Sequence, residues 1–141
     1  MPFSTYFATQ NLNWLKGTTF PAAPTNLYVT IHSATPTDNG SAADLTNTVT
    51  GSANRILLAQ SNLAAAVTAA SGGGYERITT AILTITASSV NGSAVTASHF
   101  AVWDAITGGN LLLHDALTAP VVINSGADVK FPLGSLALRC I

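Results

Sequence analysis

The pattern of apolar and polar residues changes near residue 26, from a helical period to a period of two. Ser4 is a good N-cap residue for a short helix, and Gly17 is a typical residue to end it. Pro21 and Pro24 have no backbone N–H and hold the chain extended, which predicts a strap after the helix. The apolar residues near one stripe of this helix are Phe7, Ala8, Leu12, Trp14 and Leu15.

A half-buried strand is predicted over residues 27–32, because apolar and polar side chains alternate there. Its apolar face consists of Leu27, Val29 and Ile31, and its other face of Tyr28, Thr30 and His32. Turn-forming residues fill positions 35–41 and predict a polar loop that continues toward Asp44.

The middle of the chain gives a weaker pattern. Residues 55–59 and 63–67 are compatible with helix or strand, and the surrounding Ser and Thr residues favour strand. Ser71 begins a flexible Gly-rich break before residues 78–86, where alternating β-branched residues predict one strand. Asn91-Gly92 is a strong tight-turn signal, and a further strand is expected over residues 94–103.

The last third reads as short strands separated by turns. They are expected over residues 111–114, 121–123, 129–131 and 136–138. Such closely spaced strands predict a mostly β fold, an antiparallel β-sandwich or jelly-roll-like domain with a short N-terminal helix and an extended strap. We expect residues 1–25 to form a helix and Pro-containing arm, and residues 26–141 to form a single β domain.

Composition adds a constraint on the surface. Of the 141 residues, 48% are hydrophobic and only 8% are charged, against about 25% charged in an ordinary soluble domain. So few charges predict a surface covered by copies of the chain or by a larger assembly. A net charge of −1 provides no footprint for nucleic acid, and no apolar run predicts a membrane span or a signal peptide.

Residues with catalytic or metal-binding chemistry are sparse. Cys140 is the only cysteine, and the three histidines are His32, His99 and His114. No nucleophile elbow, phosphate loop or zinc motif is present, so we expect no enzyme activity, no cofactor and no metal site. His32 and His114 are expected at a sheet edge or surface, and His99 in packing or hydrogen bonding.

Three further residue types have a structural interpretation. Trp14 and Trp103 are expected to pack in the core rather than stack on sugars. Asp38, Asp44 and Asp128 lack the spacing of a calcium loop and are ordinary turn residues. Cys140 is expected to be a small buried hydrophobe.

Several blocks of sequence carry a family resemblance. They comprise the run NLNWLKGTTFPAAP at 11–24, the strand at 27–32 with TPTD at 35–38, SHFAVWDA at 98–105, TGGNLLLH at 107–114, ALTAP at 116–120, and 123–128 with Phe131 and 136–138. In this order they resemble a family of small bacteriophage virion proteins, described as tail-fibre or head-decoration components. The resemblance implies a structural part of the virion and carries over no site residues.

We therefore expect a capsid cement or decoration protein, a homotrimer that stabilises the head by binding the major capsid protein. The alternatives are a tail or tail-fibre-associated subunit and a carbohydrate-binding module on the virion surface. The expected location is the outer surface of the particle, after synthesis in the host cytoplasm. Large apolar side chains tend to dominate binding energy. The expected partner-binding residues are Phe3, Phe7, Leu12, Trp14 and Phe20.

Overall fold

A computed structural model describes residues 3–69, 73–85, 93–126 and 128–140 of the chain. The expectations for Pro2, Ser71-Gly72, the end of the 78–86 strand at Thr86, the Asn91-Gly92 turn and the side chain of Cys140 lie outside the described residues.

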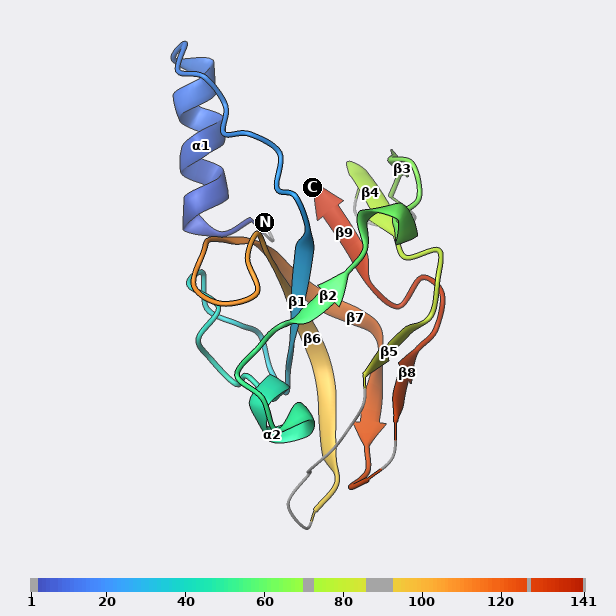
Figure 1. Ribbon diagram of the computed structural model, residues 1–141. Helices are drawn as coiled ribbons and strands as arrows, with labels where there is room; N and C mark the ends of the chain where they lie inside the picture. Colours follow the sequence, from blue (N-terminus) through green and yellow to red (C-terminus); the bar gives the residue numbers. More distant parts are fainter. Residues whose placement is uncertain (1–2, 70–72, 86–92, 127, 141) are drawn as a thin grey trace.

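The fold is mostly β, and every described strand pair is antiparallel (Figure 1). Within the described residues the strands form a four-stranded sheet in the order β2-β1-β6-β7, a second sheet β3-β4-β9 and a third, β5-β8. This arrangement confirms the predicted mostly β, sandwich-like fold with one short N-terminal helix. The elements are α1 Thr5–Leu15, β1 Leu27–His32, α2 Thr46–Thr50, β2 Ile56–Leu58, the 3-10 turn η1 Gln60–Asn62, β3 Val67–Thr68, β4 Tyr75–Ile78, β5 Leu83–Ile85, β6 Val95–Trp103, β7 Leu111–Ile123, β8 Val129–Phe131 and β9 Ala137–Cys140.

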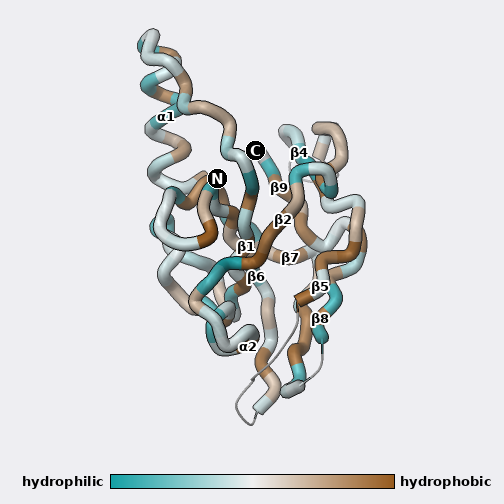
Figure 2. Tube along the Cα trace, viewed as in Figure 1, coloured by the Kyte–Doolittle hydropathy of each residue, from teal (hydrophilic) through white to brown (hydrophobic). Residues whose placement is uncertain are grey.

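The hydrophobic core lies between the four-stranded sheet and the smaller sheets. It takes side chains from β1, β2, β6 and β7 on one side and from β5 and β8 on the other. Figure 2 shows hydrophobic residues collecting where these strands approach one another. Phe100 and Phe131 are its largest fully buried side chains. Burial of this kind is the main favourable term that holds the sheets together.

β7 differs from the sequence prediction. The expected short strands at 111–114 and 121–123 are one strand of 13 residues that runs through Pro120. Its pairing with β6 passes from His99↔Ala116 to Ala97↔Val121, so several β7 residues lie opposite Ser98 in a bulge. Proline is tolerated in a bulge because no ladder bond is needed from its nitrogen. β7 bends in this region (Figure 1).

The expected strand over 78–86 is two strands in different sheets. β4 ends at Ile78 and pairs with β9, whereas β5 begins at Leu83 and pairs with β8. Thr79 lies between them, and its backbone nitrogen donates to the Leu136 carbonyl at 3.2 Å. Of the two ambiguous segments, the first contains β2, whereas the second contributes only Val67 to β3.

Candidate functional site

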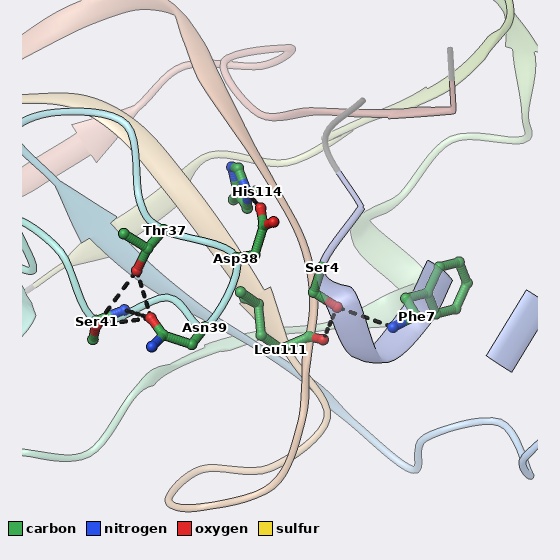
Figure 3. A network of polar contacts seen from close by, with 8 residues as sticks. All are labelled: Ser4, Phe7, Thr37, Asp38, Asn39, Ser41, Leu111 and His114. Carbon is green, nitrogen blue, oxygen red and sulfur yellow. Dashed lines mark hydrogen bonds and ion pairs between the residues drawn. The ribbon is translucent and has the colours of Figure 1, made fainter. Parts of the chain in front are cut away.

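Helix α1 is fixed to the β body at its first turn. The Ser4 hydroxyl accepts a bond from the Phe7 backbone N–H at 3.1 Å, which confirms the predicted N-cap, and also donates to the Leu111 carbonyl. The Ser4 backbone N–H donates to the Leu112 carbonyl at 3.1 Å, and Phe3 forms an isolated bridge with Leu113. Figure 3 shows this attachment at the start of β7.

Three of the predicted partner-binding residues pack on one another. The Phe3 and Phe7 rings lie 4.9 Å apart between centroids, and the Phe7 and Phe20 rings meet edge to face at 5.8 Å. Phe20 belongs to the strap, so these contacts fold the strap back onto the helix. A groove of about 460 Å³ remains between α1 and residues 20–25, with Tyr6 and Gln10 on its helical wall.

The other two predicted residues are uncovered. Leu12 is 67% exposed, Trp14 is 58% exposed and the neighbouring Leu15 is 74% exposed. The expectation that Trp14 packs in the core is therefore wrong, because α1 contacts β7 at its first turn and projects from the sheet beyond it (Figure 1). Leu15 was not among the predicted partner-binding residues, although its spacing of three from Leu12 places both on one face.

The structure also brings the three histidines to one loop, residues 33–45. His32 Nδ1 lies 2.7 Å from the Ala42 carbonyl, which can only accept, so Nδ1 carries the proton. His32 Nε2 then accepts from the Thr30 hydroxyl at 2.8 Å, and that hydroxyl accepts from Trp103 Nε1 at 3.0 Å. A neutral His32 thus uses both ring nitrogens.

The remaining histidines contact earlier residues of the same loop. His99 Nε2 lies 3.2 Å from the Thr35 hydroxyl, as expected for a hydrogen-bonding residue. His114 Nε2 lies 3.3 Å from Asp38 Oδ1, as Figure 3 shows. The loop therefore has a histidine contact near its start, its middle and its end.

The expected surface or sheet-edge location of His32 and His114 is wrong, since both are buried. The loop covers the second face of β1, where Thr30 is buried as well, so β1 is covered on both faces rather than half-buried. Burial lowers the pKa of His32; the Ala42 carbonyl and Asp44 raise it, and the charges of His114 and His99 lower it further.

A polar pocket of about 310 Å³ lies between this loop and Trp103. The Arg55 guanidinium stacks over the Trp103 ring at 3.7 Å from its centroid, and its Nη1 donates to the Ala105 and Gly108 carbonyls at 2.7 and 2.6 Å. Burial lowers the pKa of Arg55, and the carboxylates of Asp44 and Asp104 raise it. Trp103 is buried as predicted.

Gly40 is required at the edge of this pocket. Its φ is +73°, and a Cβ there would lie 2.5 Å from Trp103 Cζ2. Glycine alone satisfies both the left-handed backbone and the close approach of the ring.

The described part of the chain contains no cluster of metal ligands: no group of three or more His, Cys, Asp or Glu side chains there lies close enough to hold a metal ion. Within those same residues, no helix has the length and apolar character needed to cross a bilayer.

Comparison with known proteins completes the description. The sequence profile of a family described as podophage GP4 fiber I protein gp80 matches residues 2–139. No curated protein matches the chain. The match spans nearly the whole chain and confirms the resemblance to phage virion structural proteins of the tail-fibre type. The chain therefore belongs to the podophage GP4 fiber I protein gp80 family and is a bacteriophage virion structural protein.

Proposed function

We propose that this chain is a tail-fibre-associated structural subunit, on the outer surface of the particle, that attaches to another virion protein through α1. The sequence analysis placed a capsid cement protein first and a tail-fibre subunit second. The fibre description of the family favours the second. The role is structural, without catalysis or a cofactor.

The exposed apolar end of α1 is the observation that carries this proposal. Leu12, Trp14 and Leu15 place three large apolar side chains in solvent within four residues. Other exposed large hydrophobic residues, such as Leu57, Val122 and Leu133, are spread over separate elements. Scattered apolar residues are normal on a protein surface, whereas a concentrated group is typical of a contact site.

The charge distribution supports a protein partner for this surface. Lys16 is the only charged side chain in residues 3–26. Docking of this helix and strap therefore removes few charges from water, which lowers the cost of association. An isolated helix of this length is marginal in water, so a partner that covers its exposed face also stabilises it.

The partner in this proposal is a different virion protein, such as another component of the tail. A second copy of the same chain, as in the predicted homotrimer, is the competing occupant. Both occupants would cover the same apolar residues. Light scattering of the purified chain separates them, because self-association requires no other protein.

Incorporation into particles tests the proposal. Phage lacking the protein would be complemented with a Leu12→Gln, Trp14→Gln, Leu15→Gln variant, in which glutamine preserves helix propensity. We expect incorporation, measured by quantitative mass spectrometry, to fall at least about tenfold, because hot-spot residues of this size each contribute more than about 1 kcal/mol. Immunogold labelling of wild-type particles should decorate the tail.

The matched control is a Leu57→Gln, Ile106→Gln, Leu133→Gln variant, which removes three other exposed hydrophobic residues elsewhere. It should be incorporated normally, and circular dichroism should show that both variants are folded. Wild-type incorporation of the α1 variant would contradict the attachment surface. Labelling of the head at hundreds of copies per particle would instead support the cement protein.

A further inference from the structure

We propose that the polar pocket beside Arg55 binds a neutral sugar residue. The pocket lies between the loop and β6, shares no lining residue with the groove beside α1, and its residues have no part in the proposed attachment. Its volume of about 310 Å³ is at the lower end of small-molecule sites and is sufficient for one pyranose ring.

Arg55 provides a fixed donor edge. Stacking on Trp103 and the two bonds from Nη1 hold the guanidinium in place. Its Nε and Nη2 groups donate to no acceptor among the described residues. A donor that is already immobilised loses little conformational freedom when a ligand binds, so it contributes more to affinity than a free surface arginine.

Asp44 provides an acceptor in the same pocket. Its Oδ1 accepts from the Thr46 backbone N–H at 2.8 Å, which leaves Oδ2 without a partner in the described part of the chain. No ion pair forms there between Asp44 and Arg55, although both line the pocket. One hydroxyl of a sugar can donate to the Asp44 carboxylate while an adjacent hydroxyl accepts from the Arg55 guanidinium. A sugar therefore matches these two side chains.

Two amides complete the site. The Asn47 side chain makes no hydrogen bond to the described residues, and it lines the pocket. Asn39 uses Oδ1 to accept from the Ser41 backbone N–H at 3.1 Å and the Ser41 hydroxyl at 2.7 Å, so its NH₂ group can donate to a ligand. Amides both donate and accept, as sugar hydroxyls require.

The charges select against other ligand classes. Arg55 and Asp44 together give the pocket no net charge, so an anion such as phosphate would gain from one and be repelled by the other. An apolar ligand would bury these polar groups without partners, which is costly. Arg55 covers one face of the Trp103 ring, so the sugar is recognised by hydrogen bonds rather than by stacking on that face.

Nuclear magnetic resonance on the intact chain tests the site. A panel of neutral methyl glycosides, each at millimolar concentration, would be added to ¹⁵N-labelled protein. We expect at least one glycoside to shift the side-chain signals of Asn39, Asn47 and the Trp103 indole. Asn47→Ala and Asp44→Asn should each weaken that binding about five- to tenfold, the loss expected for one or two hydrogen bonds. Asp44→Asn keeps the oxygen that accepts from Thr46.

Matched controls are Asn54→Ala and Asp128→Asn, which change exposed residues outside the pocket lining and should leave the affinity unchanged. The proposal is overturned if no neutral glycoside shifts these signals. It is also overturned if binding is unchanged in Asn47→Ala and Asp44→Asn, or if only a uronic acid, phosphate or a free amino acid binds. Because the assay uses the free protein, failure of particle attachment would not affect its outcome.

Discussion

Two irregular segments flank β1, and they are held by different kinds of contact. The strap over residues 16–26 precedes β1 and is held by the packing of Phe20 on Phe7 and by a bond from Gln60 Nε2 to the Pro24 carbonyl at 2.9 Å. The loop over residues 33–45 follows β1 and is bonded to all three histidines. The loop is therefore held by several polar contacts with the sheet, whereas the strap is held by the Phe20 ring contact and the Gln60 hydrogen bond.

The contrast extends to what each segment exposes. The loop carries two acidic residues. Asp38 contacts His114 of the sheet, and Asp44 accepts from the Thr46 backbone N–H and lines the pocket. The helix that the strap follows instead leaves Leu12, Trp14 and Leu15 in solvent. The conformation of a segment with many internal hydrogen bonds is determined by its own chain. A concentrated group of exposed apolar residues is instead typical of a surface that a partner covers. The two regions should therefore respond differently to substitution.

The largest expected difference is in stability. Phe131→Ala should lower the free energy of unfolding by about 3–5 kcal/mol, because it leaves a cavity in a fully buried part of the core. Leu12→Ala should change it by less than about 0.5 kcal/mol, because the side chain is mostly in water already. Urea denaturation followed by circular dichroism measures both. A loss of several kcal/mol in Leu12→Ala would place α1 in the core of the protein.

A smaller effect on stability is expected where α1 joins the start of β7. Ser4→Ala removes the N-cap bond to Phe7 and leaves the Leu111 carbonyl without its hydroxyl donor. We expect a loss of about 1–3 kcal/mol in the free energy of unfolding and faster proteolysis of the strap. The control is Thr9→Ala, whose exposed hydroxyl bonds only to the carbonyl of Thr5 one turn earlier. Equal behaviour of the two variants would mean that Ser4 does not anchor the helix.

Local signals were sufficient to predict several elements from the sequence. Ser4 and Gly17 predicted both ends of α1, because capping depends on residues a few positions apart. Alternation predicted β1, and the apolar positions over residues 94–103 predicted β6. Pro120, in contrast, gave a false break in β7, because a bulge opposite Ser98 depends on the partner strand.

The binding surfaces could be predicted only in part. Apolar residues on α1 marked a candidate contact, but the pattern could not separate Phe7, which the strap covers, from Trp14, which it does not. The pocket joins Asp44, Arg55 and Trp103 from distant parts of the chain, so no local motif marks it. Likewise, the burial of His32 follows from how the loop folds over β1, which is a tertiary effect.

The smallest expected effect is a dependence of stability on pH through His32. The loop needs neutral His32, which donates from Nδ1 to Ala42 and accepts at Nε2 from Thr30. Burial holds the pKa of His32 in the folded state below its ordinary value of 6.5. Below that value the unfolded chain binds a proton that the folded chain does not. The contribution of His32 to the free energy of unfolding is therefore constant above about pH 6.5 and falls as the pH drops below it, until the folded pKa is passed.

The slope in this range should not exceed about 1.4 kcal/mol per pH unit, the limit for one proton. Urea denaturation between pH 8 and pH 5 measures it, and His32→Gln should flatten it. Asn54→Gln, a change at an exposed residue that does not titrate, is the control. If His32→Gln left the slope of the free energy of unfolding against pH unchanged, a group other than His32 would be titrating. The loop would then be stabilised by contacts other than the His32 hydrogen bonds.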